Sequence, residues 1–178
     1  GKSLLISTLE TIFKGKREYF KGLALDSLPY DWKPYPVIHL DMGSAQAEDA
    51  KMLETILLQL LANCAKDCGI PKPEGATAPL LFLNLIRALA EKSATGKVVL
   101  LIDEYDKPIL GHLGMPDVTA IKNALKAFYS VIKTTEPLQR FALLTGVSKF
   151  SKVSVFSDLN NLTDLTMDAR TATLLGRA

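Results

Sequence analysis

Residues 97–106, KVVLLIDEYD, constrain the fold of this chain more than any other stretch. Five consecutive apolar residues, three of them β-branched, lie between Gly96 with Lys97 on one side and a pair of acids on the other. A short continuous apolar run of this kind predicts a strand that is buried on both faces. Such strands are typical of parallel sheets, so we expect an α/β fold.

The rest of the chain alternates helices with strands, as a parallel sheet requires. Helical spacing of apolar residues predicts helices over residues 3–14, 47–68, 77–92 and 118–132, with Thr77 as a cap. Apolar runs predict strands over residues 37–41, 98–102 and 140–146, with a last candidate at 162–167. We therefore expect a three-layer parallel sheet with helices on both faces and ligands at the carboxyl ends of its strands.

Composition sets limits on the class of protein. The chain has 178 residues, of which 48% are hydrophobic and 22% charged, which is typical of a globular domain. Its net charge of +2 is too small to indicate a nucleic-acid or membrane surface by itself. The apolar runs are far shorter than the roughly 20 residues that cross a bilayer, so we expect no membrane segment.

The two cysteines indicate neither a disulfide framework nor a zinc site. Cys64 and Cys68 lie four residues apart in a predicted helix, and His39 and His112 match no zinc-ligand spacing. We interpret both residues as buried thiols in a reducing cytoplasm.

The chain opens with Gly1, Lys2 and Ser3, directly before a predicted helix. This triplet matches the end of the phosphate-loop pattern G-x-x-x-x-G-K-[ST]. In that pattern the amides and dipole of the helix attract phosphate, the lysine reaches the terminal phosphates and the hydroxyl ligates Mg²⁺. Because chance alone can produce a three-residue match, the triplet needs a second element to predict a nucleotide site.

Asp103 and Glu104 supply that element at the end of the buried strand. A Mg-nucleotide site needs one acid near the metal and, for hydrolysis, a second group that orients or polarises water. Adjacent residues of a strand point to opposite faces, so the two acids are suited to different roles. The alternative is that both acids simply end a strand in solvent; together with the triplet, they favour a nucleotide site.

Several other polar residues have two interpretations each. Thr145 or Ser148 could hydrogen-bond a phosphate or the attacking water, or could end a strand for local reasons. Asp41 could join the same polar network, but we favour a simple turn. Arg140 and Arg170 could stabilise charge in a transition state, although surface arginines usually do not.

Three other function classes receive less support. The histidines lack the context of a hydrolase triad, and no dinucleotide G-x-G-x-x-G pattern occurs. Lys149 and Lys152 alternate with Phe150 and Phe156 in a way that could bind nucleic acid. We favour a packed segment with two solvated lysines.

Four stretches, GKSLLISTLETIF, YPVIHLDM, VVLLIDEYDKPIL and RFALLTGVSKFSKVSVFSDLNNLTDLTMD, closely resemble the AAA-ATPase-like family of uncharacterised prokaryotic P-loop ATPases. The resemblance covers nearly the whole chain. Members look like P-loop ATPases of the additional-strand class, in which the phosphate-loop strand lies between the sensor strand and the last strand. A restriction-endonuclease-like nuclease region often follows.

This resemblance implies ATP and Mg²⁺ as cofactors. It assigns nucleotide binding to Gly1–Ser3, the metal to Ser3 and Asp103, the catalytic acid to Glu104 and a sensor role to Thr145. The DEYDKP continuation is characteristic of the family, but Tyr105, Asp106 and Lys107 receive no role beyond organising the loop after the strand.

The resemblance also implies that residues 1–178 form one incomplete AAA-ATPase-like domain, with no second domain. We expect an N-terminal truncation, because the phosphate-loop strand and the first half of the loop are missing. A chain without that strand is expected to bind nucleotide poorly and to expose the two strand edges that should flank it.

The predicted function is ATP binding and Mg-dependent hydrolysis in the cytoplasm, coupled to a conformational change of an attached or partner module. The alternative is a nucleotide-dependent switch or interaction module without significant hydrolysis. A nuclease-like C-terminal region, a homo-oligomer and DNA are left open as partners, and no membrane partner is expected.

Overall fold

The core of the fold is a parallel sheet, described by a computed structural model that covers residues 1–147, 159 and 161–165. Within these residues, the sheet has three strands in the order β1-β2-β3. They are β1 (Val37–Asp41), β2 (Val98–Asp103) and β3 (Gln139–Leu144). Every residue of the central β2 is buried, as the apolar run predicts.

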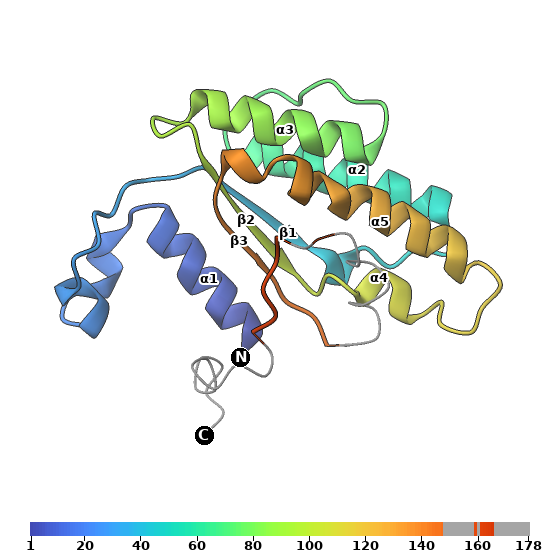
Figure 1. Cartoon of the computed structure of the whole chain (residues 1–178), viewed down its shortest axis with the longest axis horizontal. Coiled ribbons are helices and arrows are strands. Elements are labelled where there is room, and N and C mark those ends of the chain that lie inside the picture. The colour runs from blue at the N-terminus through green and yellow to red at the C-terminus, as the bar shows by residue number, and fades with distance from the viewer. Residues whose placement is uncertain (148–158, 160, 166–178) are drawn as a thin grey trace.

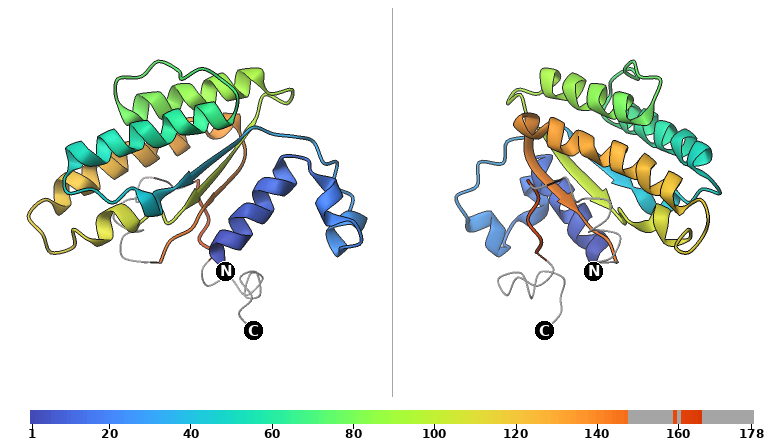
Figure 2. Two further views of the ribbon diagram at one scale, coloured as in Figure 1. Left: turned by 180° about the vertical axis from the view of Figure 1, so that it is seen from behind. Right: turned by 45° about the vertical axis from the view of Figure 1, so that its right-hand side comes forward.

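Helices cover both faces of the sheet (Figure 1). The main helices are α1 (Lys2–Phe13), α2 (Ala50–Asp67), α3 (Ala78–Lys92), α4 (Lys107–Leu110) and α5 (Val118–Thr134). Short 3₁₀ helices are η1 (Arg17–Phe20), η2 (Ala24–Ser27), η3 (Met42–Ser44) and η4 (Glu136–Leu138). Figure 2 shows α1 on one side of the sheet and α2, α3 and α5 on the other. None of the helices in the described ranges is both long and apolar enough to span a bilayer.

The alternation of side chains along β2 divides the core into two clusters. Val99 and Leu101 pack toward α1, in a small cluster that also contains Ile6 and Phe13. The alternate residues Val98, Leu100 and Ile102 belong to a larger cluster formed with α2, α3 and α5. Because side chains of a strand alternate between the two faces, each β2 side chain packs in only one of the two clusters.

Local signals explain where the helices begin and end. Gly15 follows the last residues of α1 with a φ of +75°, a left-handed conformation that glycine adopts without strain. Thr77 caps α3 as predicted, because its side chain accepts a hydrogen bond from an amide of the first turn. α2 begins later than predicted, at Ala50, because the Asp49 side chain accepts a hydrogen bond from the Met52 amide at 2.7 Å.

Two strand predictions need correction. The predicted strand 140–146 ends at Leu144, and its residues are mostly half-buried rather than fully buried, because no described strand pairs with the outer edge of β3. Residues 162–165 of the last candidate strand are not in a strand. Leu162 instead packs against the larger core cluster, which accounts for an apolar residue there without strand pairing.

We predict that Leu101→Ala and Leu100→Ala each lower the free energy of unfolding by about 3 kcal/mol, because both side chains are fully buried. Leu101→Ala should destabilise the packing of α1 on the sheet, and Leu100→Ala the packing of the helices on the other face. Hydrogen exchange should show faster opening of α1 amides in Leu101→Ala, and of α3 and α5 amides in Leu100→Ala. The same exchange pattern in both variants would contradict the division into two layers.

Candidate nucleotide site

Strand alternation places the candidate site residues on the face of the sheet that α1 covers. Asp103 comes two residues after Leu101, and Thr145 comes two residues after Leu143, and both leucines belong to the α1 cluster. Asp41 lies directly opposite Asp103 in the register between β1 and β2. The polar ends of the strands therefore meet the first turn of α1.

Asp103 is the centre of this arrangement. The Ser3 hydroxyl donates a hydrogen bond to Asp103 Oδ2 at 3.1 Å. The Thr145 hydroxyl donates to Asp103 Oδ1, which also accepts from the Glu104 amide at 3.0 Å. Asp103 itself is only 6% exposed. Segments that are far apart in the sequence thus bring Ser3 and Thr145 to one buried carboxylate, that of Asp103.

Lys2 and Gly1 lie at the N-terminal end of α1. Gly1 is the N-cap residue and is exposed, without a side chain to cap the helix. The Lys2 ammonium donates a hydrogen bond to the carbonyl oxygen of Gly146 at 2.6 Å. The lysine therefore reaches across to the loop that follows β3, on the same side as Thr145.

The Glu104 carboxylate takes its direction from the local backbone and not, as predicted, from strand alternation. Glu104 is outside β2 and has a φ of 52°, so strand alternation does not separate the two acids. The left-handed backbone instead turns the Glu104 carboxylate toward the loop after β1. A Cβ at Gly43 would lie 2.5 Å from Glu104 Oε2 and 2.9 Å from Asp41 Oδ1, so a side chain at that position would require the Glu104 carboxylate to shift.

Asp41 forms a turn, in agreement with the favoured interpretation. Its Oδ1 accepts a hydrogen bond from the Gly43 amide at 2.9 Å, and its backbone oxygen accepts one from the Ser44 hydroxyl at 2.9 Å. These bonds hold η3 against the end of β1. Asp41 therefore acts on the site indirectly, by shaping the loop on which Glu104 rests.

Gly43 and Gly146 received no role from the sequence, and Asp106 received none beyond organising the loop after the strand. A Cβ at Gly43 would lie 2.5 Å from Glu104 Oε2, and one at Gly146 would lie 2.8 Å from Asp106 Oδ1. Asp106 itself is only 1% exposed. The repeated acid in DEYD was a visible signal for Asp106. A lone glycine in a loop carries no comparable signal, because its role depends on which segment packs against it.

The remaining candidates lie away from Asp103 or outside the described residues. Arg140 lies at the start of β3, with its guanidinium 5.8 Å from the ring centre of Phe13 and 5.9 Å from that of Tyr35. It packs on aromatic rings at the end of the sheet opposite to the site. The candidates outside the described residues are Ser148, Lys149, Phe150, Lys152, Phe156 and Arg170.

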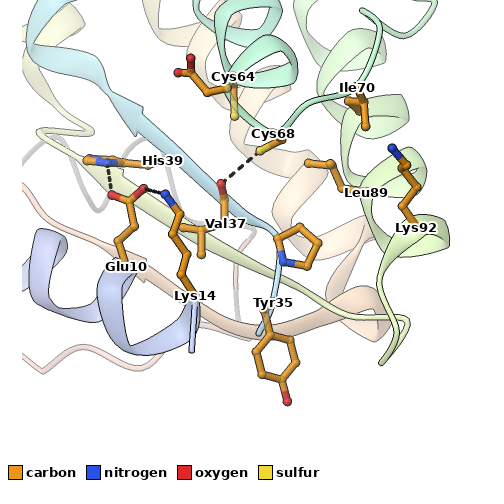
Figure 3. Close-up of a pocket in the computed structure, with 12 residues that line it drawn as sticks. Glu10, Lys14, Tyr35, Val37, His39, Cys64, Cys68, Ile70, Leu89 and Lys92 are labelled. Carbon is orange, nitrogen blue, oxygen red and sulfur yellow. Dashed lines mark hydrogen bonds and ion pairs between the residues drawn. The ribbon is translucent and has the colours of Figure 1, made fainter. Parts of the chain in front are cut away.

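A separate cavity of about 390 Å³ lies beside the start of β1 (Figure 3). Its polar groups bond to one another: His39 Nδ1 lies 3.0 Å from Glu10 Oε2, and the Cys68 thiol donates to the Val37 oxygen at 3.5 Å. Both cysteines are free thiols; Cys64 is buried as predicted, but Cys68 is only half-buried, because its side chain lines this cavity. The hydrogen bond between them lowers the pKa of Cys68 and raises that of Cys64. These side chains are distinct from those around Asp103.

Comparison with known proteins decides the family. The family described as "AAA-ATPase_like: Predicted AAA-ATPase" matches residues 1–156. The chain belongs to this AAA-ATPase-like family. The match includes the opening triplet, the acidic end of β2 and Thr145, and it agrees with the resemblance found in the sequence. The parallel sheet of this AAA-ATPase-like chain is consistent with a P-loop fold.

One curated relative matches over almost the full length of this AAA-ATPase-like chain. It is described as "Uncharacterized protein in vnfD 5'region" of Azotobacter chroococcum mcd 1, and is 41% identical over 178 residues. The alignment covers 99% of this chain but 34% of the relative, so the chain spans about a third of that protein. No solved structure matches the chain.

Proposed function

We propose that the Asp103 site binds Mg-ATP and hydrolyses it. The observation that carries this proposal is the convergence of the Ser3 and Thr145 hydroxyls on the buried Asp103 carboxylate, at the N-terminus of α1. A helix of this length presents free amides and a positive dipole end to a phosphate. The family match supports the same reading.

The oxygen atoms of Ser3 and Asp103 fit Mg²⁺. In the part of the chain that the structure covers, no group of three or more His, Cys, Asp and Glu side chains could hold a metal ion. Mg²⁺ needs no such cage, because it usually binds one or two protein oxygens together with waters and substrate phosphates. Ser3 and Asp103 would hold the ion, which would neutralise charge on the phosphate oxygens when bound.

The other residues have roles that follow from their positions. The Lys2 ammonium would bind the terminal phosphates, exchanging its hydrogen bond to Gly146 for a charged partner. Thr145 would hold Asp103 in place. Glu104, whose carboxylate lies near Gly43, would orient the attacking water and act as the base that accepts its proton.

We further infer that residues 1–178 are part of a larger ATPase, with a phosphate-loop strand next to β3. The incomplete burial of the β3 side chains and the unpaired outer edge within the described ranges support this inference. A parallel strand there would cover an edge that otherwise invites aggregation. The greater length of the curated relative leaves room for such a strand.

A nucleotide-dependent switch without significant hydrolysis is the second candidate. The observation that favours it is the position of Glu104, whose carboxylate packs against Gly43 rather than beside Ser3. An acid held there could stabilise the loop after β1 without contacting water at the phosphate. Phosphate release from ATP separates the two candidates.

We predict that Glu104→Gln in the full-length protein retains ATP binding but lowers kcat at least about 100-fold, because the amide cannot accept a proton. Lys2→Ala should instead weaken ATP binding about tenfold or more, since it removes the ammonium that meets the phosphates. Steady-state phosphate release and calorimetric binding measure the two effects. Full turnover by Glu104→Gln would rule out the proposed role of Glu104 as a base.

We predict that residues 1–178 alone bind ATP at least about tenfold more weakly than the same chain extended by the residues that precede it in its own gene. The added strand should pair with β3 and complete the phosphate loop. Titration of both proteins with ATP, at equal Mg²⁺, measures the difference. Equal affinities would refute the inference that a phosphate-loop strand is required.

A further inference from the structure

The loop after β2 and the loop after β3 are bonded to each other beyond the ends of the strands. The Thr145 amide donates to the Ile102 oxygen, and the Tyr105 amide donates to the Thr145 oxygen, both at 2.9 Å. The Val147 amide then donates to Asp106 Oδ2 at 3.0 Å. The DEYD segment thus continues the pairing of β2 with β3, with a carboxylate in place of a backbone acceptor.

Gly146 allows these two loops to approach closely. A Cβ at this position would overlap the Tyr105 ring and lie 2.8 Å from Asp106 Oδ1. The two loops are therefore in direct contact as well as hydrogen-bonded. Any side chain at position 146 would force Tyr105 or Asp106 to move.

Asp106 is fixed from the core side of this contact. Asp106 is 1% exposed, whereas Val147 is 70% exposed. The hydrogen bond from the Val147 amide therefore connects a surface loop to a buried carboxylate. The hydroxyl of the buried Tyr129 donates to the Tyr105 oxygen at 2.6 Å. Burial, with the nearby Asp106 charge, raises the pKa of Tyr129, so its hydroxyl remains a donor. The Tyr129 side chain of α5 therefore stabilises the DEYD segment from the core side.

The loop that Asp106 anchors carries two groups of the nucleotide site. Thr145 places its hydroxyl on Asp103, and Gly146 presents its carbonyl oxygen to Lys2 at 2.6 Å. Both contacts depend on where residues 145–147 lie relative to β2. The phosphate-binding end of α1 is held separately, by packing of α1 on the sheet.

We propose that Asp106 is a positioning residue, which fixes residues 145–147 so that Thr145 meets Asp103 and Gly146 meets Lys2. This inference rests on the proposed ATPase function. Releasing the loop should slow the chemical step, because Thr145 no longer holds Asp103. It should change nucleotide binding much less, because the amides of α1 stay in place.

The test removes the bond from its exposed side, in the full-length protein. Val147→Pro deletes the amide donor, and Val147→Ala is the matched control that keeps it while truncating the same side chain. We expect Val147→Pro to lower kcat about tenfold with KM changed less than about threefold, and Val147→Ala to keep normal kinetics. Equal kcat values for the two variants would overturn the proposal.

Asp106→Leu removes the acceptor from the buried side. Combined with Val147→Pro, it should lower kcat by less than the product of the two single effects, because both variants delete the bond between Asp106 and Val147. Multiplying effects would contradict the proposal. If Asp106→Leu does not fold, the comparison of kcat between Val147→Pro and Val147→Ala is sufficient to test the proposal.

Hydrogen exchange separates this inference from the proposed function. An unmodified protein that hydrolyses no ATP would refute the ATPase proposal, but the Thr145 amide still reports on the loop. That amide should exchange at least about tenfold faster in Val147→Pro than in Val147→Ala. Unchanged exchange would overturn the role of Asp106 whatever the activity.

Discussion

The hydrogen bonds to the Asp103 carboxylate connect the parts of this fold that matter for function. A buried carboxylate is costly unless donors surround it. Here the donors come from the first turn of α1, from the residue after β3 and from the backbone after β2. The need to satisfy one buried charge therefore brings together residues that lie 100 and 42 positions from Asp103.

Packing makes this convergence possible. Ile6 and Phe13 of α1 bury Val99 and Leu101 of β2, and this contact fixes the height and direction of the helix over the sheet. Among the α-helices of the described ranges, α1 is the one on its face of the sheet, and its N-terminal turn meets the strand ends directly. The larger cluster on the opposite face supplies rigidity. It also supplies Tyr129, which supports the acidic loop from behind.

Local signals explain what the sequence could predict. The apolar run of β2 and the triplet before α1 are short patterns with strong structural meaning, so Ser3 and Asp103 were identified together. The orientation of Glu104 could not be predicted, because its left-handed backbone and its contact with Gly43 depend on tertiary packing. Residues 162–165 were misread because apolar residues that pack on helices, such as Leu162, resemble those of a strand.

We propose that Asp103 makes nucleotide binding depend on Mg²⁺. Calorimetric titration of the full-length protein with ATP, in Mg²⁺ and in EDTA, tests it most directly. The unmodified protein should bind ATP at least about tenfold more tightly in Mg²⁺, a difference of about 1.4 kcal/mol. Asp103→Asn should abolish that difference, whereas Asp49→Asn should keep it, because asparagine caps α2 as well as aspartate does. An unchanged Mg²⁺ dependence in Asp103→Asn would contradict the account.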